Sequence, residues 1–297
     1  MVDQEMLKEA LKPVISLLDV CPMGVRIPSD WKAPEGFELE LFDVDGIPVE
    51  HLVPKGNNGK VILQFHGGGF LFSYLDCYRE TACVYSKVAN GAQVYSVDYR
   101  VAPQYKFPCA HEDCLNVYKW LLGKGINSQD IIIVGDSAGG NLALSVTLQI
   151  RDQSLPLPKA VITISPWASL KGGYKARTEN FEKDIILGKY GVKFGEMALD
   201  PSYYTETSNL NNPYISPVFG DYKDFPDLLV QAGSYEFLLD DAKAVVTEAK
   251  AKGVNVTFSV YEEMSHDFQL FLPGLEQSKN AWKEISDFLL KEFEFVK

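Results

Sequence analysis

Apolar residues in this chain gather in short runs, and the runs alternate with longer stretches whose apolar residues recur at helical spacing. A short apolar run is typical of a buried strand, whereas spacing of three and four residues is typical of a helix with one buried face. This alternation predicts an α/β fold, in which helices cover both faces of a mostly parallel sheet. Eight strands are predicted, over residues 37–44, 47–53, 60–66, 92–98, 130–135, 159–165, 227–232 and 254–261.

The first two predicted strands are joined by Asp45-Gly46, a pair that is typical of a hairpin turn. We therefore expect the sheet to begin antiparallel and to continue through parallel crossovers. Helices are predicted for the later connections, over residues 110–122, 138–152 and 240–252, and the C-terminal stretch has the same periodicity. Each of these helices is expected to cover the sheet.

Two regions lie outside this alternation. Residues 1–35 contain a predicted helical region in which Pro13 must start, kink or end a segment, and residues 166–222 form a long insertion between two strands. A connection of that length in a compact domain is usually functional. We expect both regions to pack together as a cap at the carboxyl edge of the sheet, where open α/β folds bind ligands. The alternative to a cap is a partly flexible surface insertion. In either case, the catalytic domain is predicted to comprise residues 36–165 and 223–297.

Composition narrows the class of partner. The 297 residues carry a net charge of -12 and show no clustered basic face of the kind that nucleic-acid binding requires. No window approaches the roughly 18 uninterrupted apolar residues of a membrane span, and the start of the chain lacks the basic segment of a secretory signal. The five cysteines are odd in number and form no CxxC pair, which favours reduced thiols. We therefore expect a soluble, cytoplasmic protein.

The sharpest chemical signal is Gly135-Asp-Ser-Ala-Gly139, which follows the apolar residues 131–134 and leads directly into a predicted helix. A G-x-S-x-G motif between strand and helix holds a nucleophilic serine on a tight turn, and its glycines let the two backbones pass closely. The amides at the start of the helix favour the negative charge that develops in acyl transfer. Ser137 is therefore the predicted nucleophile.

A glycine triplet provides an independent signal. His66-Gly-Gly-Gly-Phe70 follows the apolar residues 61–65, and three consecutive glycines cost backbone entropy that is explained if their amides must turn toward an anion. A phosphate cradle is the competing interpretation, but neither the Lys-Ser/Thr of a Walker loop nor G-x-G-x-x-G spacing is present. We predict an oxyanion hole formed by the amides of Gly68, Gly69 and Ala138.

A serine hydroxyl needs a general base near neutral pH, and the chain has four histidines. His51 lies in a predicted strand, His66 in the glycine loop and His111 at the start of a predicted helix. His266 follows the last predicted strand, at the edge of the sheet where Ser137 also emerges. Serine, then an acid, then a late histidine is the order found in α/β-hydrolases. His266 is the predicted base.

Three carboxylates follow the seventh predicted strand. Asp240 and Asp241 immediately precede a helix, so capping and the helix dipole account for them without catalysis. Glu236 lies in the loop just beyond the strand end, where an acid could reach the ring nitrogen of His266 that faces away from the serine. Glu236 is the predicted triad acid, and Asp240 is the alternative.

Together, these segments resemble the hormone-sensitive-lipase-like family of esterases. The resemblance implies an α/β-hydrolase fold with an eight-stranded, mostly parallel sheet and a helical cap. It also implies hydrolysis of short-acyl carboxylic esters without cofactor or metal, with oxyanion donors from the two later glycines and the residue after the nucleophile. Most members have Asp where this chain has Glu236, and some members with a Gly-Ser-x-Glu-x-Leu-Leu-Asp-Asp segment use Glu. The resemblance covers the chain from residue 60 nearly to its end and rests on His66-Gly-Gly-Gly-Phe70, Asp98-Tyr-Arg-Val-Ala-Pro103, Gly135-Asp-Ser-Ala-Gly-Gly140, residues 233–241 and Ser265-His266.

Two other functions fit parts of the pattern. An amidase similar to arylformamidase would use the same triad, although the glycine loop favours esters. A receptor similar to the plant gibberellin receptor would bind a ligand without turnover, but that receptor lacks the histidine that this chain has at position 266. The predicted partner is a small acyl ester, and a homodimer is expected only by analogy.

Overall fold

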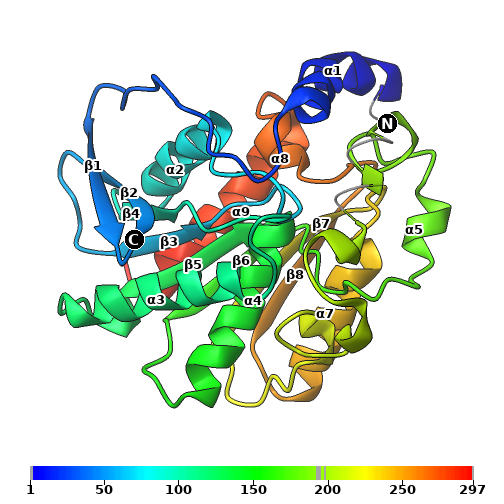
Figure 1. Ribbon diagram of the computed structural model, residues 1–297. Helices are drawn as coiled ribbons and strands as arrows, with labels where there is room; N and C mark the ends of the chain where they lie inside the picture. The colour runs from blue at the N-terminus through cyan, green and yellow to red at the C-terminus, as the bar shows by residue number, and fades with distance from the viewer. Residues whose placement is uncertain (1–2, 192–194, 197–198, 296–297) are drawn as a thin grey trace.

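The computed structural model describes residues 3–191, 195–196 and 199–295 (Figure 1). Its central element is one sheet in the order β1-β2-β4-β3-β5-β6-β7-β8. The eight predicted strands are all present, with ends displaced by one or two residues at most, so the predicted fold class is confirmed. The strands are β1 (Phe37–Val44), β2 (Ile47–Pro54), β3 (Val61–Phe65), β4 (Gln93–Val97), β5 (Ile131–Asp136), β6 (Ala160–Ile164), β7 (Asp227–Gly233) and β8 (Val256–Tyr261).

Strand β2 runs opposite to the other strands of the sheet. β2 pairs antiparallel with β1 and with β4, as the Asp45-Gly46 turn predicts for the first pair. All later neighbours pair in parallel, from β4 and β3 through β5 and β6 to β7 and β8. Because parallel strands end at the same edge, the loops that follow β3, β5, β6, β7 and β8 open on one side of the molecule.

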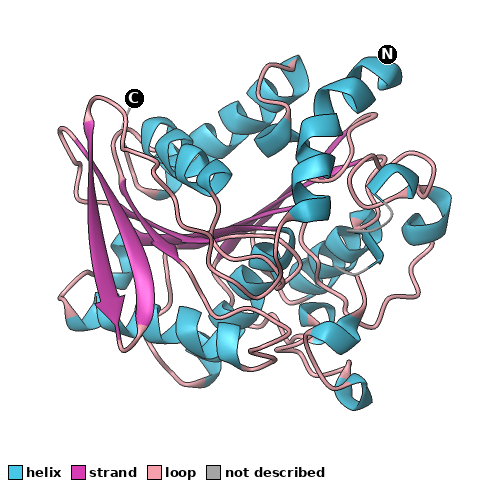
Figure 2. Cartoon of the chain, turned by 45° about the horizontal axis from the view of Figure 1, so that its top comes forward, coloured by secondary structure: helices cyan, strands magenta, loops and turns pink. Residues whose placement is uncertain are grey.

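Alternate residues of each strand feed two separate cores. In β3, Ile62 packs in a hydrophobic cluster on one face of the sheet, whereas Val61 and Leu63 pack in a second hydrophobic cluster on the opposite face. This period of two is what a sheet buried on both faces requires. Figure 2 shows the strands running between the helices. The first face is covered by α2 (Asp76–Val88) and α9 (Glu276–Glu292), and the second by α3 (Cys109–Gly123), α4 (Ser137–Asp152) and α7 (Leu239–Ala251).

The N-terminal region forms a single helix, α1 (Gln4–Val20), with Pro13 inside it. Its buried residues, Leu7, Leu11 and Leu18, join the core on the α4 side of the sheet. The insertion over residues 166–222 contains no long helix among its described residues. Its described residues include α5 (Ala176–Glu179) and the short 3-10 turns η2 (Lys189–Gly191), η3 (Pro201–Tyr203), η4 (Thr207–Asn209) and η5 (Pro217–Phe219). The remaining elements are η1 (Ser128–Asp130) and α8 (Phe268–Phe271).

Helix α1 touches both the insertion and the loop after β8. The Lys8 ammonium lies 4.4 Å from the centroid of the Tyr190 ring, and Gln4 Nε2 donates to the Glu263 carbonyl at 3.2 Å. These contacts bring the two extra regions together beside the carboxyl edge of the sheet (Figure 1). Their action as a cap stays a prediction. Among the described residues, no helix has the length and apolar character needed to cross a membrane.

One close approach of backbones depends on glycine. A Cβ atom on Gly139, in the first turn of α4, would lie within 3.0 Å of the carbonyl oxygens of Phe65 and His66 at the end of β3. Main-chain atoms of a central strand cannot move away cheaply, so the helix can cross the strand here only without a side chain.

We expect Gly139→Ala to lower the free energy of unfolding by about 1–3 kcal/mol or more, because the new methyl group overpacks the junction. Gly123→Ala is the matched control, since a Cβ there meets nothing within 4 Å at the exposed end of α3. Urea unfolding followed by circular dichroism measures both. Equal stability of the two variants would contradict the packing argument.

Candidate active site

Ser137 stands at the junction of β5 and α4, with no residue between strand and helix. Its φ angle is +51°, in the left-handed region that non-glycine residues seldom occupy. Strain of this kind persists only where the surroundings enforce it, and it concentrates at functional sites. The residue is 8% exposed, and the Trp167 amide donates to its carbonyl at 2.9 Å. The predicted nucleophile therefore lies on a strained turn at the carboxyl edge of the sheet.

The glycine loop after β3 lies against this turn. Gly68, Gly69 and Phe70 have φ angles of +99°, +65° and +61°, a left-handed succession that glycine makes possible. A Cβ atom on Gly67 would collide with the Asp136 carboxylate, so loop and turn are in contact. Among the described residues, the amides of Gly68 and Gly69 donate no hydrogen bond to another protein group. Two donors beside Ser137 are thus left for a ligand.

His66 anchors the glycine loop. The His66 ring stacks on Tyr99 with centroids 4.0 Å apart, and its Nδ1 atom lies 2.8 Å from the Gly67 carbonyl. The Tyr99 hydroxyl also donates to the His66 carbonyl at 2.6 Å. Burial lowers the pKa of His66 to about 3, so the ring is neutral at physiological pH. The residue holds the loop and is not placed to act as the base.

The other two histidines outside the last loop are also engaged elsewhere. His51 lies between Glu40 and Gln93, at 2.9 and 2.7 Å. His111 pairs with the Tyr204 hydroxyl at 2.7 Å, and burial lowers its pKa to about 3. His266 is the histidine that lies beside the carboxyl edge of β8.

His266 is buried in the loop between β8 and α8. Its Nε2 atom is paired with the Asp267 carboxylate at 3.0 Å, and its Nδ1 atom has no hydrogen-bond partner. Burial lowers the pKa of His266, but the carboxylates of Asp267, Glu236 and Asp184 outweigh burial and raise it to about 9. The nitrogen expected to face Ser137 is thus occupied by Asp267, a residue for which the sequence carries no separate signal.

Glu236 is fully buried in the loop after β7. One carboxylate oxygen, Oε2, accepts hydrogen bonds from Ser165 Oγ at 2.6 Å and from the Gly233 amide at 3.1 Å. The other oxygen, Oε1, is buried without a partner. Burial raises the pKa of Glu236 to about 8, although the charge of His266 acts in the opposite direction.

Asp240, the alternative acid, is committed to other groups. Its carboxylate accepts from the Ala176 amide at 3.0 Å and pairs with Lys243 at 3.2 Å. Asp241 is likewise bound by the Ser169 amide and by Arg177. Of the three acids after β7, only Glu236 has a free buried oxygen and acts on the charge of His266.

The buried atoms without a partner in this region include Oε1 of Glu236 and Nδ1 of His266. An imidazole N–H is a donor and a carboxylate oxygen is an acceptor, so one hydrogen bond between them would satisfy both. Buried polar atoms rarely stay unpaired, and a site that leaves a matched donor and acceptor open is suited to rearrangement.

Two further carboxyl groups surround the histidine. Asp184 comes from the insertion and accepts from the amides of Ile186, Leu187 and Phe237. Asp136, which precedes Ser137, has its pKa raised well above the usual range by burial and by the Asp267 carboxylate, while His266 opposes the shift. These mutual effects place the serine turn and the histidine loop within electrostatic reach of each other. Asp184 lies in the irregular insertion, where the sequence offered no signal for it.

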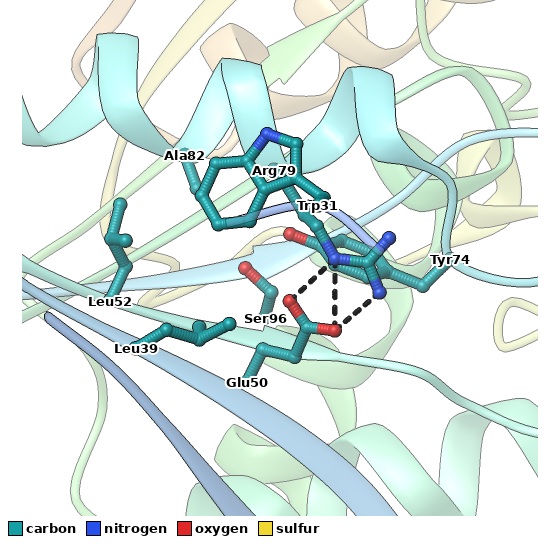
Figure 3. A pocket seen from close by; sticks show the side chains of 8 residues that line it. All are labelled: Trp31, Leu39, Glu50, Leu52, Tyr74, Arg79, Ala82 and Ser96. Carbon is teal, nitrogen blue, oxygen red and sulfur yellow. Dashed lines mark hydrogen bonds and ion pairs between the residues drawn. The ribbon is translucent and has the colours of Figure 1, made fainter. Parts of the chain in front are cut away.

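A hollow lies between the first strands and α2, and Ser137 is not among the residues that line it (Figure 3). The hollow is lined by an ion pair in which the Arg79 guanidinium donates to both carboxylate oxygens of Glu50. Trp31 also lines the hollow. Arg79 also bonds Asp76 at 2.5 Å. With both charges paired, this hollow has a structural explanation and no reactive group.

Comparisons with known proteins agree with this geometry. Residues 62–270 match the family model described as alpha/beta hydrolase fold. The chain is 31% identical over 281 residues to an esterase of Acinetobacter venetianus, covering 94% of this chain and 88% of that protein. An acetyl-hydrolase of Streptomyces hygroscopicus is 33% identical over 250 residues, covering 84% and 82%. A crystal structure of an esterase from the bacterial hormone-sensitive lipase family superposes with a TM-score of 0.83 at 31% identity, covering 96% of this chain and 98% of that one.

We expect Asp267→Asn to lower the pKa of His266, because the amide carries no charge to stabilise the imidazolium. The ring would then lose its proton at lower pH than in the wild type. The measurement is an NMR titration of the imidazole C–H signals, with the His266 signal assigned by its loss in His266→Gln. Exposed Asp30→Asn serves as control, and an unmoved or higher His266 midpoint in Asp267→Asn would refute the assignment.

Proposed function

This chain belongs to the α/β-hydrolase family, in its hormone-sensitive-lipase-like branch, and on that premise we propose that it is a carboxylesterase acting on short-chain acyl esters. Ser137 is the nucleophile, His266 the general base and Glu236 the acid that orients and stabilises the base. The names of the relatives, an esterase and an acetyl-hydrolase, support this reaction and a small acyl group.

One observation carries the proposal. A serine held at φ +51° on the strand-to-helix turn lies beside a glycine loop whose Gly68 and Gly69 amides have no acceptor among the described residues. A nucleophile next to unpaired amide donors is the arrangement that acyl transfer needs, because the oxyanion forms within reach of both.

The reaction proceeds in two halves. Ser137 Oγ attacks the ester carbonyl as His266 removes its proton, and the resulting imidazolium then protonates the departing alkoxide. A water molecule, deprotonated by the same imidazole, attacks the acyl-enzyme and releases the carboxylic acid. Every proton passes through His266, so these steps call for neither metal nor cofactor.

The histidine must change partner to start this sequence. Its Nε2 atom bonds Asp267 in the structure, and proton transfer from Ser137 requires Nε2 to leave that carboxylate. In the reactive arrangement Nδ1 donates to Oε1 of Glu236, which pairs the two buried atoms that are otherwise unsatisfied. Glu236 then fixes the tautomer of the ring and stabilises its charged form.

The oxyanion is bound by backbone amides. We assign this role to Gly68, Gly69 and Ala138, the last at the start of α4, where the helix dipole also favours negative charge. Each such donor contributes about 3 kcal/mol to stabilising the transition state.

The finer features of the proposal come from the sequence. We retain the small acyl ester as the partner, a cytoplasmic location, a homodimer by analogy, and α1 with the insertion as a cap over Ser137. The low exposure of Ser137, 8%, favours small acyl groups over long chains.

We expect hydrolysis of p-nitrophenyl esters to be fastest with acetate and butyrate and to decline toward palmitate, because a nearly enclosed serine leaves little room for a long chain. Ser137→Ala should lower kcat by about 10⁴-fold or more. Steady-state kinetics across the acyl series measures both effects. A rate that rises steadily to palmitate would contradict the chain-length claim, and a fully active Ser137→Ala would refute the nucleophile.

We expect Glu236→Gln to lower kcat by about 10²- to 10⁴-fold, because an amide can neither stabilise the imidazolium nor enforce the correct tautomer. The matched variant Asp240→Asn should change kcat only slightly, since Asp240 bonds Ala176 and Lys243 instead. Both variants are assayed on p-nitrophenyl acetate. A larger loss in Asp240→Asn would make Asp240 the triad acid.

A further inference from the structure

Ser165 follows β6 directly and is fully buried. Its φ angle is +45°, so a second serine at the same edge of the sheet holds the strained left-handed conformation. Its amide donates to the Gln231 carbonyl in β7 at 2.8 Å, which fixes the backbone of the turn. The fixed backbone therefore holds the Ser165 side chain between the loop of Glu236 and the loop of His266.

The hydroxyl of Ser165 makes two hydrogen bonds. It donates to Oε2 of Glu236 at 2.6 Å and accepts from the Asp267 amide at 3.2 Å. A hydroxyl has one proton and two lone pairs, so both bonds form at once. One buried atom thus connects the predicted triad acid to the peptide that follows the predicted base.

We propose that Ser165 is a positioning residue for ester hydrolysis, whose hydroxyl orients Glu236 toward His266 and holds the histidine loop in place. The inference rests on the proposed function. Ser165 touches neither substrate nor reacting atoms and acts only through these two neighbours.

The contacts of Glu236 explain why such a residue is needed. Ser165 and the Gly233 amide both bind Oε2, which leaves Oε1 as the only oxygen available to the imidazole. A glutamate side chain has one more rotatable bond than aspartate and loses more conformational freedom when it is fixed. Two donors on the same oxygen restrict this long side chain.

The hydrogen bond from Ser165 also favours the ionised form of Glu236. Burial raises the pKa of Glu236, whereas the Ser165 hydroxyl and the Gly233 amide lower it. The charged groups that face this pair are His266 and Asp267 from the last loop, Asp184 from the insertion and Asp136 from the serine turn. Without the Ser165 hydroxyl, Glu236 is less ionised and its carboxylate is less firmly oriented toward His266. Both changes weaken the stabilisation of the imidazolium.

The test uses Ser165→Gly and Ser165→Ala in the full chain. Glycine suits a positive φ, so Ser165→Gly removes the hydroxyl without adding backbone strain. We expect kcat on p-nitrophenyl acetate to fall about 10- to 100-fold with KM nearly unchanged, as for a misplaced catalytic group. The NMR titration midpoint of His266 should fall in both variants.

Ser86→Ala is the matched control, because Ser86 is a buried serine whose hydroxyl bonds the Ala92 carbonyl at 2.6 Å within the α2 layer. It should lower the melting temperature but leave kcat and the His266 midpoint at wild-type values. If the role of Ser165 were purely structural, its variants would behave like Ser86→Ala, with a lower melting temperature but unchanged kcat and His266 midpoint. Wild-type kcat and an unmoved His266 midpoint in Ser165→Gly would overturn the inference.

The two proposals fail in different ways. A wild-type protein that hydrolyses no ester would refute the proposed function, and the His266 midpoint would then decide alone whether Ser165 orients the acid. Activity that Ser137→Ala abolishes, but that Ser165→Gly leaves intact, would uphold the esterase and refute the role of Ser165.

Discussion

Parallel pairing of four adjacent strands is the constraint on which the candidate site depends. β5, β6, β7 and β8 all end at one edge, and a residue of the candidate site lies within five residues of each strand end. Ser137 follows β5, Ser165 follows β6, Glu236 follows β7 and His266 follows β8. These residues are far apart in the chain but lie near one another because hydrogen bonding between neighbouring parallel strands holds the strand ends side by side.

Burial of charge is the second constraint. An imidazole enclosed with carboxyl groups would be costly if those groups lacked partners, because desolvation disfavours each ion. The structure offsets this with main-chain donors, three to Asp184 and one to Glu236. The result favours the protonated ring, which is the form of His266 that appears when the serine is deprotonated. Oε1 of Glu236 and Nδ1 of His266 are among the buried atoms that remain unpaired, and they are the atoms that the proposed reaction needs to bring together.

Local signals made much of this predictable. The strands follow from short apolar runs, and the turn at Ser137 and the loop at Gly68 follow from glycines whose conformations other residues seldom adopt. Ser165 and Asp184 could not be found, because their importance lies in contacts across strands and with the insertion. The sequence also did not predict helix α2, since its buried face includes the polar residues Thr81 and Ser86. The roles of Glu236 and His266 themselves stay predictions.

The placement of α1 has a practical consequence for handling the protein. This helix begins beside the insertion and the loop that bears His266, and it is attached there through Lys8 and Gln4. The last helix, α9, ends instead near the strands at the far side of the sheet (Figure 1). An affinity tag fused ahead of α1 would therefore lie close to the loop that bears His266. Purification handles and surface-immobilisation tethers therefore belong after α9.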